Sequence, residues 1–135
     1  MAGPRMTRPF SPIQFEAFMA VLRDVVKGLA ARDGVDAVVV LSSDGLPIDH
    51  ASRKAFDADA VAALAASFVQ GAHRLGQSAE CEPLSTGVLE YGDRMAIVAP
   101  VGGGNLLFVL TSAGTNAGQL LFDLRRHRPA LAQLL

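Results

Sequence analysis

The sequence lacks the means for covalent cross-linking and for clustered metal binding. It contains a single cysteine among 135 residues, Cys81, which cannot form a disulfide within the chain. The three histidines, His50, His73 and His127, are scattered and show no spacing typical of a metal site. A chain of this length buries roughly two-thirds of its unfolded surface, so its fold needs neither kind of support. We expect no metal and no cofactor.

Signals for export, membrane insertion and nucleic-acid binding are also missing. Met1–Phe10 contains two prolines and two arginines and no apolar run, unlike a signal peptide. The longest apolar stretch, Ala60–Ala66, is far shorter than the ~20 residues of a membrane span. A net charge of -1 provides no basic field for nucleic acid or for an anionic membrane. These absences favour a cytoplasmic protein with no nucleic acid among its partners and no membrane span.

What the chain does have is a large share of apolar residues. Its length suits one domain, which we place at residues 11–135, after a flexible N-terminal arm at residues 1–10. Hydrophobic residues make up 50% of the chain, and the mean hydropathy is +0.32. We interpret these values as apolar surface kept for another chain. We therefore expect an interaction module and not an enzyme.

The segment Asp57–Gly76 shows this pattern most clearly. It is predicted to be one helix, yet no Asp, Glu, Lys or Arg occurs between Asp59 and Arg74. A stripe at helical spacing is expected to face the sheet: Val61, Leu64, Phe68, Ala72 and Leu75. The other face and its flank are expected to contact a partner: Ala62, Ala63, Ala66, Val69, Gln70 and His73. The alternative is that alanine, the best helix former, lines a solvated face.

Two further helices are predicted at the ends of the chain. Ser11 begins the first as an N-cap, with proline in the first turn and glutamine three residues after the cap, and Gly34 is expected to end it. Asn116 begins the last helix, which Pro129 should kink or break.

Five strands are predicted between these helices, at residues 37–41, 46–51, 83–91, 95–99 and 106–110. The second contains Pro47 and the third contains Gly87, so both belong at the edges of the sheet. Short connections make hairpins of neighbouring strands. The pattern therefore predicts an α+β fold of order αββαβββα, with a five-stranded antiparallel sheet of strand order 2-1-5-4-3.

The third predicted strand is an edge without protection. It has no lysine and no proline between Leu84 and Tyr91, and such an edge invites pairing with another chain. Alternate residues along it complete the predicted interface: Leu84, Thr86, Val88 and Glu90. Each backbone hydrogen bond across the edge contributes about 0.5–1.5 kcal/mol, so several of them favour a dimer.

Local patterns along the chain resemble the roadblock/dynein-light-chain domain, a profilin-like αββαβββα module. The run Gly34–Val40, followed by Ser43–Ile48 with its Asp-Gly turn and Pro-Ile pair, is similar to the opening of that family. Asn116–Gly118 resembles the family's Asn-Leu-Gly, with Ala117 at the usual leucine. The resemblance covers roughly residues 15–126.

The resemblance implies a non-catalytic homodimer joined at its third strands, with the second helices packed alongside each other. It also implies that the first and last helices cover one face of the sheet and the second helix the other. Bacterial members bind a Ras-like small GTPase and stimulate or regulate its hydrolysis, so such a GTPase is the implied partner. The alternative is a structural assembly subunit, homodimeric or heterodimeric, without a GTPase. Under either reading, Ala66→Glu is expected to split the dimer or abolish partner binding while the fold survives.

Three groups of chemically suggestive residues have simpler interpretations. Cys81 and His73 lack an orienting group for a nucleophilic pair, so Cys81 is expected to be structural, at a strand entrance. The glycines 102–104 join two strands and lack the lysine of a phosphate loop, although a small-ligand sensor or an enzyme that uses this loop stays an alternative. The basic cluster Arg125–Arg128 is expected to complement the dipole at the end of the last helix, with an anion or membrane site as the alternative.

Overall fold

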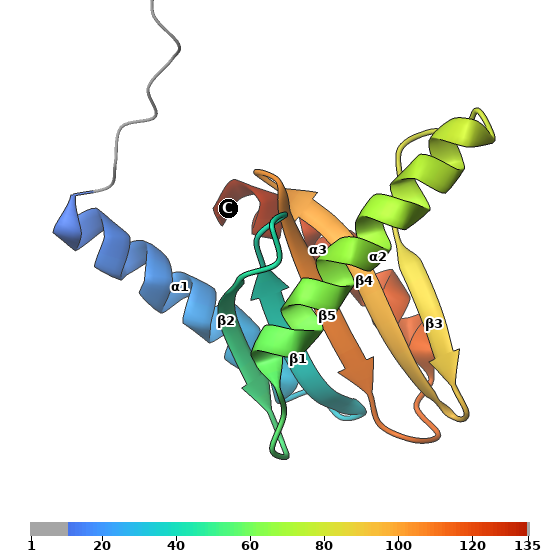
Figure 1. The fold of residues 1–135 in the computed structure, drawn as a ribbon. Helices are drawn as coiled ribbons and strands as arrows, with labels where there is room; N and C mark the ends of the chain where they lie inside the picture. The colour runs from blue at the N-terminus through green and yellow to red at the C-terminus, as the bar shows by residue number, and fades with distance from the viewer. Residues whose placement is uncertain (1–10, 135) are drawn as a thin grey trace, which may run out of the picture.

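The computed structural model describes residues 11–134, in which three helices surround one five-stranded sheet (Figure 1). The elements are α1 (Pro12–Ala30), β1 (Val35–Leu41), β2 (Pro47–Ser52), α2 (Ala58–Ser78), β3 (Gly87–Tyr91), β4 (Arg94–Gly102), β5 (Asn105–Thr111) and α3 (Ala117–Leu134). The strand order is β2-β1-β5-β4-β3, and every neighbouring pair is antiparallel. The predicted order of elements and of strands is confirmed.

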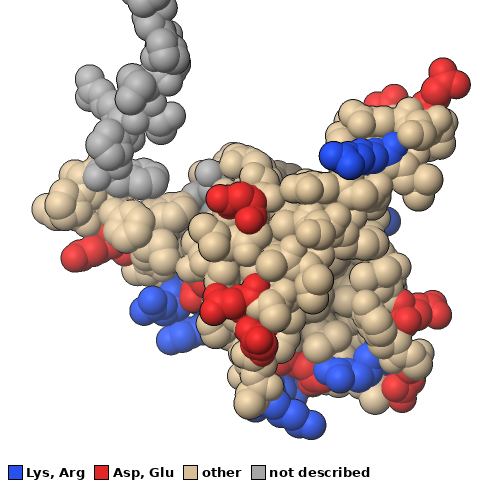
Figure 2. All heavy atoms as spheres, in the orientation of Figure 1, with Lys and Arg blue, Asp and Glu red and all other residues tan. Residues whose placement is uncertain are grey.

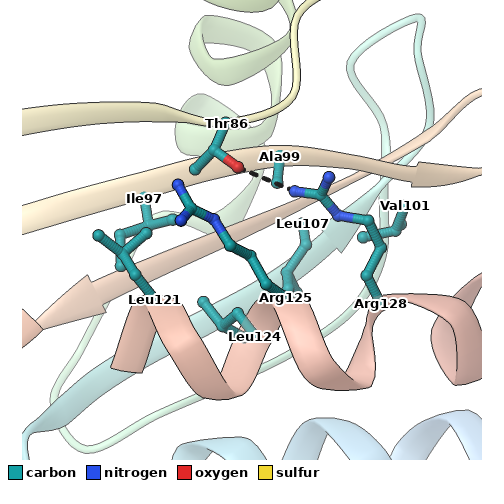
Figure 3. Close-up of a pocket in the computed structure, with 9 residues that line it drawn as sticks. All are labelled: Thr86, Ile97, Ala99, Val101, Leu107, Leu121, Leu124, Arg125 and Arg128. Carbon is teal, nitrogen blue, oxygen red and sulfur yellow. Dashed lines mark hydrogen bonds between the residues drawn. The ribbon is translucent and has the colours of Figure 1, made fainter. Parts of the chain in front are cut away.

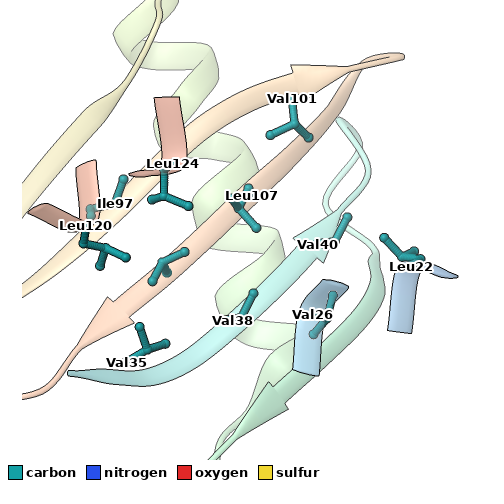
Figure 4. Packing of buried hydrophobic residues seen from close by; sticks show 11 residues of the cluster. Leu22, Val26, Val35, Val38, Val40, Ile97, Val101, Leu107, Leu120 and Leu124 are labelled. Carbon is teal, nitrogen blue, oxygen red and sulfur yellow. The ribbon is translucent and has the colours of Figure 1, made fainter. Parts of the chain in front are cut away.

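One face of the sheet is covered by α1 and α3 (Figure 4). Val38 of β1 packs in the same cluster as Leu22 and Val26 of α1, while α3 contributes Leu120 and Leu124. Successive residues of a strand point to opposite faces, so a central strand covered on both faces must be apolar throughout. That requirement explains the continuous apolar run at residues 37–41 of β1.

The other face of the sheet is covered by α2 alone, as Figure 1 shows. Val39 and Leu41 of β1 pack against alanines of α2 that include Ala62. The helix lies close to the turn between β1 and β2, because a Cβ added at Gly45 would lie 3.1 Å from the Cα atom of Ala63. The confirmed arrangement is thus α1 and α3 on one face and α2 on the other.

Helix α1 begins as predicted and ends earlier. The Ser11 hydroxyl accepts a hydrogen bond from the Gln14 N–H, and the Gln14 side chain accepts one from the Ser11 N–H. The predicted end at Gly34 is wrong, because the helix stops at Ala30. Gly34 instead precedes β1 with a φ of +87°, and a Cβ there would lie 2.5 Å from Cγ2 of Thr115. Glycine is therefore required at this position for both reasons.

Helix α3 continues through Pro129, so the predicted break is wrong. The predicted start is confirmed, because the Asn116 side chain accepts hydrogen bonds from the Gly118 and Gln119 N–H groups. The cluster Arg125–Arg128 consequently lies inside the helix and not in its last turn. Its predicted role beside the helix dipole is wrong, since that effect is confined to the terminal turn.

Strand β3 is shorter than the sequence predicts. It spans Gly87–Tyr91, which leaves Leu84 and Thr86 in the connection that follows α2. Strands β4 and β5 are longer than predicted, so the glycine loop shrinks to a turn around Gly103 and Gly104. Across residues 11–134, none of the helices is long and apolar enough to cross a membrane.

Candidate partner-binding surface

Helix α2 is rotated about its axis relative to the predicted orientation. The sequence pattern places Ala62 and Ala66 on the partner face, which is wrong, because they are 0% and 4% exposed and pack against the sheet. The same pattern places Leu64 and Leu75 in the core, which is also wrong, because they are 70% and 71% exposed. The close approach of α2 to the turn at Gly45 favours small side chains at Ala62 and Ala66, where helix and turn are nearest. Larger side chains of α2, Val61 and Phe68 among them, are partly buried against the same cluster.

The other predicted residues of α2 keep part of their surface exposed, although Val69 packs against the cluster between helix and sheet. Ala63 and Gln70 are exposed, whereas Val69 and His73 are half-buried. Val69, Gln70 and His73 line a shallow depression of about 330 Å³ together with Arg74 and Gln77. Their contact with a partner stays a prediction.

An apolar groove of about 440 Å³ lies between α2 and the strands β3, β4 and β5. Helix α2 contributes Leu64 and Phe68, β3 contributes Leu89 and Tyr91, and none of the residues that line the groove is charged. Leu64 is 70% exposed and Tyr91 is 61% exposed, so large apolar side chains face the solvent here. Figure 2 shows few charged side chains over this part of the α2 face. Exposed apolar surface of this kind is typical of an interaction site.

The groove lies beside the open edge of the sheet. Within residues 11–134, β3 pairs with β4 and has no strand on its other side. The opposite edge, β2, carries Pro47 and a half-buried carboxylate at Asp49, both of which discourage pairing with another chain. Val88 and Glu90 lie in β3, while Leu84 and Thr86 precede it, so the predicted interface divides between strand and connection.

Polar contacts at one end of the sheet serve the fold. Asp36 of β1 accepts hydrogen bonds from the Ser112 hydroxyl and, at 2.8 Å, from the Arg94 guanidinium. The hydrogen bond from Ser112, followed by the charge of Arg94, lowers the pKa of the Asp36 carboxyl against the effect of burial. Arg94 also donates to the Thr111 carbonyl. This network joins the ends of β1, β4 and β5.

A second ion pair links two helices. Arg32, just after α1, donates to Asp123 of α3, and this hydrogen bond is the main reason why the pKa of Asp123 is lowered. The ion pair thus joins the end of α1 to α3.

The residues considered for chemistry do not assemble into a reactive site. No group of three His, Cys, Asp or Glu residues comes together for a metal ion within the described part of the chain. Cys81 is exposed and lies in the connection after α2, well before β3 begins, so its predicted place at a strand entrance is wrong.

Arg128 makes contacts that sequence reasoning missed. Its guanidinium donates to the Ser85 carbonyl at 2.7 Å, to the Ser85 hydroxyl at 3.2 Å and to the Thr86 hydroxyl at 2.9 Å (Figure 3). The partners are more than forty residues apart in sequence, so no local pattern links them.

Comparison with known proteins gives a family match and a common fold. The family model of the Roadblock/LC7 domain matches residues 21–111. The crystal structure of a Roadblock/LC7 domain from Streptomyces avermitilis is 26% identical and has a TM-score of 0.69, and the match covers 79% of this chain and 94% of that one.

Two MglB structures are 18% identical to the chain, and a likeness at that level shows the fold alone. MglB of Myxococcus xanthus has a TM-score of 0.74 over 90% of this chain and 96% of its own. The gliding protein MglB of Thermus thermophilus has a TM-score of 0.76 over 98% of this chain and 97% of its own. No curated protein sequence matches the chain.

Proposed function

Since the chain belongs to the Roadblock/LC7 domain family, we propose that it is a homodimer that binds a Ras-like small GTPase and regulates its nucleotide state. The observation that carries the proposal is a largely uncharged α2 face beside an unpaired strand edge. The chain itself supplies no catalytic residue and acts in the cytoplasm with its GTPase. It changes the balance of GTPase conformations by binding one nucleotide state more tightly than the other.

The proposed dimer forms at the β3 edge. Antiparallel pairing of two β3 strands places the groove of each protomer next to the two-fold axis, where Leu64 and Tyr91 of both chains lose their exposure. A stable interface removes roughly 1,600 Å² of surface in total. Five strand residues alone cannot provide that area, so the apolar groove and the neighbouring part of α2 must contribute to the contact.

The proposed GTPase contact is the outward face of α2. Ala63, Ser67 and Gly71 are exposed and follow one another at intervals of four residues, so a stripe of small side chains runs along one side of the helix until Arg74. A Cβ at Gly71 would meet nothing within 4 Å. Glycine inside a helix costs about 1 kcal/mol relative to alanine, and no contact among the described residues accounts for it. Close approach of a partner to this face supplies a reason.

A pull-down with the candidate GTPase, loaded with GDP or with a GTP analogue, tests the proposal. We expect unequal binding of the two forms and loss of binding in Gly71→Arg. Gly28→Arg is the matched control, because Gly28 also lies in a helix, is exposed and has open space around its missing Cβ. Equal and negligible capture of both forms by the native dimer would reject the regulator.

That negative result would favour the alternative, a structural assembly subunit. The groove and the open β3 edge support dimerisation with or without a GTPase. This second function predicts a stable dimer or heterodimer in solution that binds neither the GDP-loaded nor the GTP-loaded GTPase.

A further inference from the structure

The segment just before β3 is held from the far side of the sheet. Arg128 lies on α3, and its guanidinium reaches Ser85 and Thr86 with the three hydrogen bonds given above. In Figure 3 its side chain extends from α3 towards the segment before β3 that carries Thr86. Hydrogen bonds from an ionised donor are shorter and stronger than neutral ones, so this contact fixes the position of residues 85–86 firmly.

The pairing of β3 with β4 explains why this segment needs a donor. Gly87 pairs with Val98, so continuing the same register would set Ser85 opposite Pro100. Proline has no N–H and cannot donate a hydrogen bond to a neighbouring strand. The Ser85 carbonyl receives its hydrogen bond from Arg128 instead, at 2.7 Å. The ladder therefore ends at Gly87, although Leu84 and Thr86 continue a strand-like pattern.

The other end of β3 is fixed by the chain itself. Tyr91 pairs with Arg94, which leaves only Gly92 and Asp93 in the turn, and Gly92 has a φ of +67°. A two-residue turn sets the register of its hairpin. Edge strand β3 is thus defined at one end by this turn and at the other by Arg128.

The position of Arg128 separates this role from partner contact. It lies on the face covered by α1 and α3, opposite the apolar groove and the outward face of α2. Beside it, Arg125 lines the same small crevice but donates no hydrogen bond within the described residues. Loss of the Arg128 side chain therefore removes the contact with residues 85–86 without removing a side chain from the apolar groove or from the outward face of α2.

We propose that Arg128 is a positioning residue that fixes where β3 begins, and so sets the length and register of the edge offered to a second chain. The three hydrogen bonds support the fixed position of residues 85–86. The effect on pairing with a second chain rests on the proposed dimer. Without Arg128, residues 84–86 are free to move, and the start of the exposed edge is no longer fixed. The edge then offers several registers in place of one.

Two measurements on Arg128→Ala test this proposal. The rate of amide hydrogen exchange at residues 86–89 should rise about tenfold or more, because charge-assisted hydrogen bonds are lost. The dissociation constant of the dimer should also rise about tenfold. Exchange at β1 should stay unchanged, which a general loss of stability would not allow. Arg128→Lys keeps the positive charge but loses the forked set of donors. Its exchange rate and its dimer dissociation constant should therefore lie between those of the native chain and of Arg128→Ala.

Arg126→Ala is the matched control, since Arg126 is exposed on the same helix and has no hydrogen bond to residues 85–86. Equal exchange at residues 86–89 in the Arg126 and Arg128 variants would overturn the inference. If the native chain proves to be a monomer, the proposed dimer is rejected. Faster exchange at residues 86–89 in Arg128→Ala would still support the positioning role in that case. The two proposals can therefore fail separately.

Discussion

At the scale of single residues, Asp36 gives the fold a defined response to acid. Its carboxylate is held by Ser112 and Arg94, and its folded pKa lies below the unfolded value of about 3.9. A depressed folded pKa means that the contribution to stability is complete above the unfolded pKa and is lost as the pH falls through the folded pKa.

We predict that Asp36→Asn lowers the stability at pH 7 and flattens the loss of stability below pH ~4. The amide cannot balance the charge of Arg94, which explains the first effect. Urea unfolding at pH 7 and in steps down to pH ~2.5 measures both. Asp33→Asn is the control, because Asp33 is exposed and makes no hydrogen bond or ion pair in the described chain. Parallel acid curves for the native chain and Asp36→Asn would contradict the assignment.

Individual burial was the hardest property to predict from the sequence. In a helix with few charges, the apolar stripe Val61, Leu64, Phe68 competes with an alanine stripe, and hydrophobic size favours the first. The distance between helix and sheet decides the outcome, and that distance depends on the turn at Gly45, which belongs to another element. The contacts of Arg128 escaped prediction for the same reason, because both partners are placed by tertiary structure.

At the scale of elements, the rotation of α2 reverses the expected effect of two substitutions. Ala66→Glu should now unfold the chain, because the carboxylate would be buried between α2 and the sheet without a partner. Leu64→Glu should keep the fold and lose the dimer, because that side chain is 70% exposed in the groove. Circular dichroism with thermal melting, followed by light scattering, separates the outcomes. A folded, dimeric Ala66→Glu variant would show that α2 presents its alanines outward after all.

The elements themselves could be predicted well because their signals are local. The Ser11 capping box and the apolar runs of β1, β4 and β5 act over a few residues. The early start predicted for β3 failed for a non-local reason, because its register would continue opposite Pro100 of β4. The break predicted in α3 failed because the helix continues past Pro129, although proline removes a hydrogen bond there. We have no physical account of why the helix tolerates Pro129.

At the scale of the whole molecule, the two edges of the sheet differ, and this difference predicts how copies assemble. The strand order followed from the sequence because Pro47 and Gly87 mark the edges, but which edge pairs depends on the groove beside β3, whose walls come from α2 and three strands.

We predict a particle of twice 14.1 kDa by light scattering. Because its interface is apolar surface and backbone hydrogen bonds, raising the salt from 0.1 M to 1 M should leave the mass unchanged, whereas an ion-paired dimer would weaken as the screening length falls from about 10 Å to about 3 Å.

Val88→Lys on β3 should lower the mass towards that of the monomer, and His50→Lys on β2 should not. Both residues are exposed strand positions, and only Val88 lies at the unprotected edge. A native chain that stays at 14.1 kDa up to millimolar concentration would remove the basis for the proposed assembly.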